Sequence, residues 1–228
     1  SIDGSKIDVV IEDLSEEKSG VIDSGSSAAF GTILIWGNDD TVTLKSGKIL
    51  YGTSNQVAAI ATLWGENEGC KIQIEGGQIV RKENSEPGSG VFYTCNSSES
   101  QSNVEISISG GEIDYGNGRG IFQDAVIPAN SKIISGGTFA QEVAEELCAE
   151  GFIPQTNADN TFGVKSGYYY AQIGDVKYES LQDAINAAND GETVKLIKAV
   201  TDGSGITIAE SKFGTDGLTI DLDRLTYT

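Results

Sequence analysis

The clearest feature of the chain is an alternation of apolar and polar residues that ends each time in a small residue and a glycine. It occurs in TVTLKSGKI (Thr41 to Ile49), KIQIEGGQI (Lys71 to Ile79), VEISISGGEI (Val104 to Ile113) and KIISGGTF (Lys132 to Phe139). Alternate residues of a strand share one face, so each copy predicts a strand with one apolar face. The copies recur at intervals typical of a solenoid, in which each coil stacks on its neighbour.

Alignment on the last glycine of each copy predicts three apolar columns along the inside of the solenoid. Their members are Leu44, Ile74, Ile108 and Ile134; Val42, Ile72 and Ile106; and Ile49, Ile79, Ile113 and Phe139. The third column follows the first by five residues, an odd number that would turn it outward in an unbroken strand. The glycines must therefore form corners that restore the inward orientation, which residues free to adopt positive φ can do. Lys132 replaces an apolar residue in the last copy, so we expect an irregular last coil.

The pattern changes after Phe139. Val143 and Leu147 are four residues apart and Gly151 follows, which predicts a short amphipathic helix at about 140–150. A hairpin is expected at about 152–165, around an Asn/Asp turn, and helix and hairpin together would cap the solenoid. We expect the first domain to span residues 1–166, with roughly four to five coils.

Residues 167–228 predict a smaller α+β unit. A hairpin turns at Gly174 and Asp175, and Ser180 with Asp183 forms a capping box for the helix that follows. ETVKLIKAV, GITIAE and LTIDLDRLTYT alternate like new strands. The expected class is therefore mainly β: a parallel β-helix with a helix-plus-hairpin cap and a small C-terminal α+β unit.

Composition narrows the expected partners. The formal net charge is −19 and the chain has no histidine, which argues against nucleic acid and anionic membranes, because both require clustered Lys and Arg. No apolar run approaches the roughly 18 residues of a membrane span. Cys70, Cys95 and Cys148 lack metal-ligand spacing, so we expect buried free thiols, with a Cys70–Cys95 disulfide as the alternative.

Two segments carry a resemblance to a known group of proteins. The first consists of SGGTF with the following EVAEELCAEGF and TNADNTFGV, and the second is GDVKYESLQDAINAANDGETVKLIK. Both are similar to modules of secreted and wall-attached surface proteins of Gram-positive bacteria. These proteins belong to the right-handed parallel β-helix class shared with pectate lyases and polygalacturonases. The resemblance implies a right-handed, pectin-lyase-like β-helix, an extracellular or cell-wall location, and a second β-helix that starts within residues 167–228. It says little about chemistry.

The chemistry of β-helical polysaccharide-degrading enzymes needs carboxylates beside a basic residue. The constellation that best fits this requirement is Glu112, Asp114, Arg119 and Asp124, and the simpler interpretation is a solvated loop with a surface ion pair. No cofactor is expected. Calcium is the alternative, at the oxygen-rich turns Asn38, Asp39 and Asp40 or Asn157, Asp159 and Asn160, although turn formation alone explains these residues.

Trp36 and Trp64 give the sharpest hypothesis. Each follows an apolar strand and precedes glycine and an acidic turn. If Ile33 and Ile35, and Ala61 and Leu63, face inward, both indoles face outward and stack in adjacent coils. With Asn38, Asp39, Glu66 and Asn67 they would form a ligand-binding surface for a neutral sugar. The alternative is a structural pair covered by another segment.

The function expected from the sequence is therefore a non-catalytic cell-surface or adhesin-like module that binds a neutral glycan or a surface protein. A polysaccharide lyase or glycoside hydrolase on the β-helix scaffold is the first alternative. A structural spacer is the second.

Overall fold

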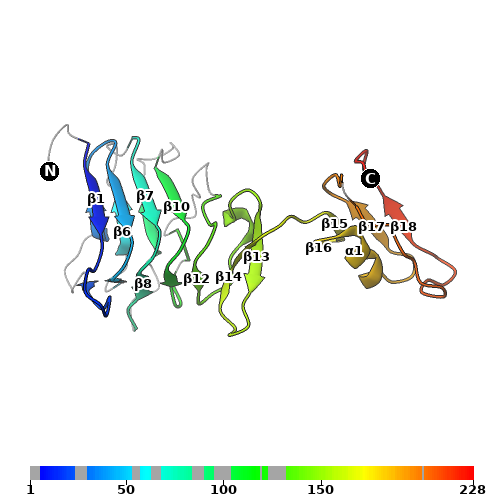
Figure 1. The fold of residues 1–228 in the computed structure, drawn as a ribbon, viewed down its shortest axis with the longest axis horizontal. Helices are drawn as coiled ribbons and strands as arrows, with labels where there is room; N and C mark the ends of the chain where they lie inside the picture. Colours follow the sequence, from blue (N-terminus) through cyan, green and yellow to red (C-terminus); the bar gives the residue numbers. More distant parts are fainter. Residues whose placement is uncertain are drawn as a thin grey trace. The chain divides into compact units, whose positions relative to one another are not determined.

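The chain folds into two units, Ser1–Lys165 and Ser166–Thr228, in the computed structural model. The structure describes residues 6–23, 30–52, 57–62, 68–83, 90–94, 104–118, 120–122, 132–201 and 203–228. The first unit is a β-solenoid of about six turns, more than the four to five coils predicted (Figure 1). The coil at Cys148, which bridges Ile134, was missed because residues 140–150 were expected to form a helix.

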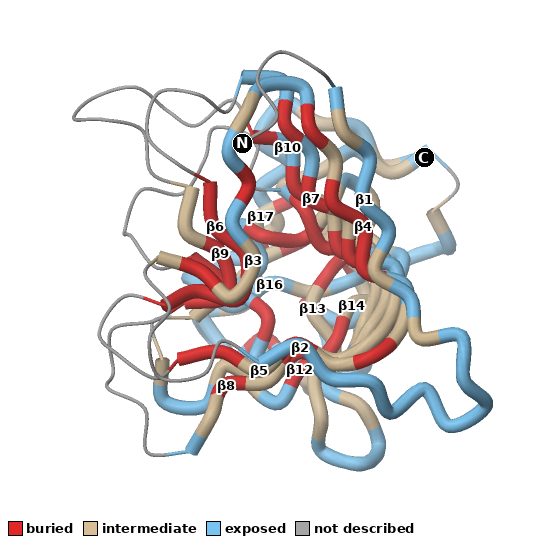
Figure 2. The backbone as a smooth tube through the Cα atoms, turned by 90° about the vertical axis from the view of Figure 1, so that its left-hand side faces the viewer, coloured by how far each residue is buried: buried red, intermediate tan, exposed pale blue. Residues whose placement is uncertain are grey.

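Three sheets form the walls of the solenoid, and buried residues line the space between them (Figure 2). The first wall has the order β1 (Asp8–Ile11), β4 (Thr41–Leu44), β7 (Lys71–Ile74) and β10 (Glu105–Ile108). The second has the order β13 (Phe152–Thr156), β14 (Phe162–Ser166), β12 (Thr138–Phe139), β11 (Glu112–Asp114), β8 (Gln78–Arg81), β5 (Lys48–Tyr51) and β2 (Val21–Asp23). The third is β3 (Gly31–Ile35), β6 (Ala58–Thr62) and β9 (Phe92–Thr94).

The strand register confirms the three predicted apolar columns. In the first wall Leu44 pairs with Ile74, Ile74 with Ile108, and Ile108 bridges Ile134. The second column, Val42, Ile72 and Ile106, and the third, Ile49, Ile79, Ile113 and Phe139, are paired in the same way. All these side chains are buried in one hydrophobic core. Like residues therefore stack over like residues, at the spacing of about 4.8 Å between neighbouring strands.

Glycines form the corners between the first and second walls. Gly47, Gly77, Gly111 and Gly137 have φ angles of +83°, +73°, +87° and +95°, in the region that favours glycine. The corners also stack closely: a Cβ on Gly110 would lie 2.2 Å from the carbonyl oxygen of Glu75. Glycine is thus required both by backbone conformation and by the distance between coils.

The predicted helix at about 140–150 is wrong. The segment contains only a short 3₁₀ helix, η1 (Glu145–Leu147), although Val143 and Leu147 are buried as expected. The backbone instead joins the preceding coil, since Ile133 and Ile134 donate to the carbonyl of Leu147, both at 2.9 Å. The backbone of the last coil therefore supplies hydrogen-bond partners for this segment. In a continuous helix the same backbone groups would instead bond to each other. The irregular last coil is confirmed, because Ile134 forms isolated bridges rather than a strand.

The predicted hairpin is present as β13 and β14. Phe162 of β14 pairs with Phe139 in an antiparallel arrangement, so the hairpin adds to the end of the otherwise parallel second wall. Phe152, Phe162 and Val164 pack against the core.

The second unit contains α1 (Leu181–Ala187) and a sheet in the order β16 (Val176–Tyr178), β15 (Ala171–Ile173), β17 (Thr193–Leu196) and β18 (Thr219–Asp221). Ser180 caps the helix by accepting a hydrogen bond from the Asp183 backbone N–H at 3.0 Å. The strand expected at GITIAE does not form. Gln182 instead accepts from Thr207 N–H and donates to its carbonyl, at 2.7 and 2.9 Å, and so takes the backbone partners that a neighbouring strand would need.

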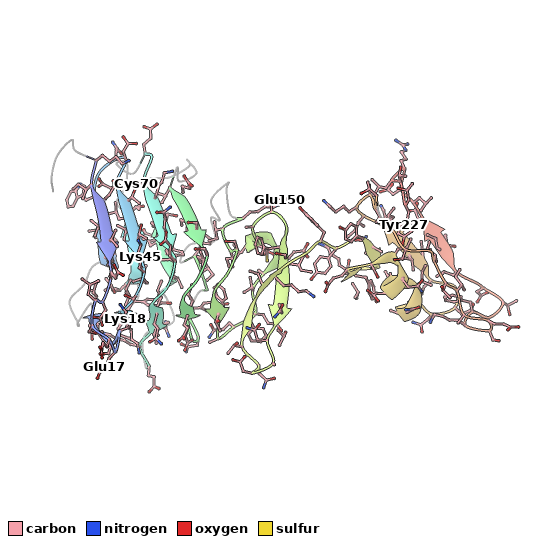
Figure 3. The ribbon with its side chains drawn as sticks, in the orientation of Figure 1. Glu17, Lys18, Lys45, Cys70, Glu150 and Tyr227 are labelled. Atoms are coloured by element: carbon pink, nitrogen blue, oxygen red, sulfur yellow. The ribbon has the colours of Figure 1, made fainter. Side chains whose placement is uncertain are left out.

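The strand β17 pairs with β18 in parallel, and the two are 26 residues apart, as Thr193 pairs with Thr219. A second parallel contact joins Val200 and Tyr227, whose side chain is seen in Figure 3. A small core of Ala171, Leu181, Ala184, Ile185, Ala188 and Val194 supports this sheet.

Candidate functional site

The outward side of the first wall carries two rows of polar residues. One row is Asp8, Thr41, Lys71 and Glu105, and the other is Thr43, Gln73 and Ser107, each set by the strand register. The apolar Val10 precedes Thr43 in the second row. The rows cross the strands, so they run from coil to coil. Hydroxyl, amide and charged groups therefore recur at the coil spacing of about 4.8 Å.

Neighbouring members of these rows interact. Lys71 Nζ and Glu105 Oε2 form an ion pair at 2.8 Å, and both side chains are largely exposed. The hydrogen bond that Lys71 donates to Glu105 raises the pKa of Lys71, with the carboxylate charge adding to the effect. The Thr43 hydroxyl donates to Gln73 Oε1 at 3.1 Å, so the Gln73 Nε2 hydrogens remain directed away from that contact.

A groove of about 530 Å³ lies over this polar surface. Its lining consists of Lys6, Asp8, Asp39, Thr41, Thr43, Gly69, Lys71 and Gln73. The volume is within the range of small-molecule sites. We call this surface the first-wall groove.

Trp36 and Asp39 belong to the connection that leads from the third wall into the first. Trp36 is 55% exposed and follows the buried Ile35, so its predicted outward orientation holds. Asp39, at φ +58°, lines the first-wall groove. The side chain of Asn38 serves the solenoid itself, because its Oδ1 accepts from the Glu68 backbone N–H at 2.9 Å.

The prediction for the second tryptophan extends beyond the described residues, since Trp64, Glu66 and Asn67 all lie outside them. The strand that precedes Trp64 pairs in a different register from the one predicted. The register places Ile60, not Ala61, beside the inward Ile33, and the core contains Ile60. The ladder offset of 27 residues, as between Ile33 and Ile60, also differs from the 28 that separate the tryptophans. The stacking of two indoles therefore does not follow from the ladder.

The residues of the enzymatic alternative lie on the second wall. Ile113 points into the core, so Glu112 and Asp114 on either side of it point outward. Glu112 accepts from Gln78 Nε2 at 2.7 Å, and Asp114 Oδ1 accepts from Gly116 N–H and Gln141 Nε2 at 2.8 and 3.0 Å. Both carboxylates therefore bridge neighbouring coils or turns. Arg119 and Asp124 lie outside the described residues.

The proposed calcium turns are occupied by hydrogen bonds of their own. Asp40 Oδ1 accepts from the Ile7 backbone N–H at 3.0 Å. Asp159 Oδ1 accepts from the Thr161 hydroxyl and N–H at 2.6 and 3.0 Å, which lowers the pKa of Asp159. Among the residues that the structure describes, no three His, Cys, Asp or Glu side chains gather as metal ligands would.

Cys70 and Cys148 are buried free thiols, as expected. Cys70 is labelled in Figure 3. Burial raises the pKa of both, that of Cys148 to about 11, so both stay protonated at neutral pH. Cys95, the partner of Cys70 in the alternative disulfide, lies outside the described residues.

One polar feature of the core escaped the sequence analysis. Tyr51 pairs in register with Arg81, and both are buried, at 0% and 7% exposure. Arg81 Nη1 donates to Asn117 Oδ1, while the Tyr51 hydroxyl lacks a hydrogen-bond partner among the described residues. Burial raises the pKa of Tyr51 well above its ordinary value, an effect that Arg81 opposes. The alternation along the strands could have indicated this, because Tyr51 and Arg81 each lie two positions after a predicted core isoleucine and so share its inward face.

We expect Tyr51→Phe to raise the free energy of unfolding by about 1 kcal/mol, because it removes a buried hydroxyl without a hydrogen-bond partner. Urea unfolding measures the change. Tyr115→Phe is the matched control: its hydroxyl donates to the Glu142 carbonyl at 3.4 Å, so this variant should not be stabilised. A loss of stability in Tyr51→Phe would mean that the Tyr51 hydroxyl has a hydrogen-bond partner in solution.

No protein-family model, curated protein sequence or solved structure matches this chain. The fold places it in the class of parallel β-solenoid proteins. No helix in the described part of the chain is both long and apolar enough to cross a bilayer.

Proposed function

We propose that this chain is a non-catalytic cell-surface module, extracellular or wall-attached, that binds a neutral glycan along the first-wall groove. The solenoid would be right-handed, with the hairpin β13–β14 as its cap, as the resemblance to surface proteins implies. The observation that carries the proposal is the groove, with its rows of hydroxyl, amide and charged groups at the coil spacing.

The chemistry of the groove favours an uncharged, hydroxyl-rich ligand. Thr41 and the Gln73 amide nitrogen offer hydrogen-bonding groups for sugar hydroxyls, and Lys71 is neutralised by Glu105. The net charge of −19 opposes a polyanionic glycan. A linear glycan laid across the strands would meet equivalent groups in successive coils.

Trp36 would add an aromatic face at one end of this surface. An exposed indole can stack on the apolar face of a sugar ring, and Asp39 of the same connection lines the groove. Catalysis receives no comparable support, because Glu112 and Asp114 lie on a different wall.

A glycan array of neutral and acidic polysaccharides, followed by calorimetry on any hit, tests the proposal. Trp36→Ala and Gln73→Ala should each weaken binding about tenfold, since each removes one contact worth about 1.4 kcal/mol. Trp36→Phe keeps an aromatic face and should retain most of the affinity.

Val176→Ala, at a side chain 60% exposed in the second unit, is the matched control and should bind like the wild type. Equal binding by all variants would remove the groove as the site. An array without any hit would favour a protein ligand or a spacer.

A further inference from the structure

The turn at residues 115–118 of the solenoid contains the single Asn-Gly pair of the sequence, Asn117 and Gly118. Asn117 is exposed. A backbone hydrogen bond closes the turn, in which the Gly118 N–H donates to the Tyr115 carbonyl at 2.8 Å. Gly118 has no Cβ, so no side chain of its own shields its backbone nitrogen from the Asn117 amide. The turn therefore presents an electrophilic amide carbon and a sterically open nitrogen next to each other.

An arginine from the neighbouring coil reaches this turn. Val80 of β8 pairs with Asp114 of β11, and Arg81, the next residue, is thus level with the start of the turn. Arg81 Nη1 donates a hydrogen bond to Asn117 Oδ1. The guanidinium is always charged, and Arg81 is only 7% exposed. A positive charge is therefore held against the oxygen of the Asn117 side-chain amide, at a position that water reaches poorly.

We propose that Asn117 is a site of spontaneous deamidation, and that Arg81 promotes the reaction and stabilises its product. In the first step the Gly118 backbone nitrogen attacks Cγ of Asn117, an N–Cγ bond forms, and the nitrogen loses its proton to water. The Cγ–Nδ2 bond then breaks, and Nδ2 takes up a proton and leaves as ammonia. Water opens the resulting cyclic succinimide at either carbonyl, which gives aspartate or isoaspartate at this position. Water is consumed and ammonia is released, and nothing is oxidised or reduced.

The position of Arg81 favours both the attack and the product. When the nitrogen attacks Cγ, negative charge develops on Asn117 Oδ1, and a donor already placed on that atom stabilises the charge. After hydrolysis to aspartate the same oxygen belongs to a carboxylate, which binds a guanidinium more strongly than a neutral amide does. The attack requires the Gly118 N–H to leave the Tyr115 carbonyl, which costs one hydrogen bond in an exposed turn. Deamidation would thus add an ion pair between two coils.

Peptide mapping by mass spectrometry, over a time course of the full chain at mildly alkaline pH, tests the site. Asn117 should convert well before Asn157, which precedes alanine and donates from Nδ2 to Thr161 Oγ1 at 3.0 Å. Gly118→Ala keeps both Asn117 and Arg81 and should stop nearly all conversion, because the added methyl group hinders ring closure. Conversion of Asn117 no faster than that of Asn157 overturns the proposal. So does unchanged conversion in Gly118→Ala, which would mean direct hydrolysis of the amide.

Variants of Arg81 test the part that the guanidinium plays. Arg81→Gln removes the charge and should slow the conversion of Asn117 about tenfold, the change in rate that corresponds to about 1.4 kcal/mol of lost stabilisation. Arg81→Lys keeps a charge and should slow it less. Conversion as fast in Arg81→Gln as in the wild type overturns the role of Arg81.

The product is tested separately, so that the proposal stays open to refutation if Arg81→Gln does not fold. Asn117→Asp mimics the aspartate product and should raise the urea midpoint of unfolding above that of the wild type, because it pairs with Arg81. Asn117→Ala removes the acceptor and should lower the midpoint. A midpoint for Asn117→Asp at or below that of the wild type overturns the stabilisation of the product.

Discussion

Gly111→Ala is expected to lower the free energy of unfolding of the first unit by about 3 kcal/mol. Its φ of +87° costs an alanine about 1–2 kcal/mol. The added Cβ would also lie 2.9 and 3.0 Å from the carbonyl oxygens of Gly76 and Gly77. These atoms belong to the backbone of the neighbouring coil, so relief requires the coils to separate locally.

Gly120→Ala is the matched control. Its φ of +93° is similar, but a Cβ there meets no atom of the described residues within 4 Å, so only the conformational cost of about 1–2 kcal/mol applies. Urea unfolding followed by tryptophan fluorescence measures both, because Trp36 and Trp64 lie within the first unit. Equal losses in the two variants would show that coil-to-coil contact at the glycine corner does not limit stability.

Ile108→Ala is expected to lower the free energy of unfolding by about 3–4 kcal/mol, as usual for a large buried side chain. Ile108 is fully buried, and its strand neighbours in the column, Ile74 and Ile134, lie on either side. The cavity would therefore be enclosed from above and below, where coils cannot close without shifting their ladders. The same urea titration reports the change.

Ile22→Ala provides the comparison at the open end of a column. Ile22 pairs with Ile49 but is 38% exposed, so its truncation should cost about 1 kcal/mol or less. A large loss here would mean that the first coil is covered in solution.

Part of the candidate site could be predicted from the sequence. The outward orientation of Trp36 follows from strand parity beside the buried Ile35. The first-wall groove was missed, because its lining comes from residues in several coils that meet only through register. Asn38 illustrates a further limit: its residue type suits sugar binding, but its side chain holds the turn of the next coil.

Local residue patterns by themselves determined the repeated strands, the inward columns and the glycine corners, because alternation and positive φ are properties of short segments. Tertiary structure decided where coils of unequal length come into register. It placed Ile60 rather than Ala61 beside Ile33 in the third wall, gave Tyr51 and Arg81 a shared buried position, and drew residues 145–149 onto the last coil in place of a helix. The physical reason is that each outcome depends on a hydrogen-bonding or packing partner about 15 or more residues away, which a local pattern does not contain.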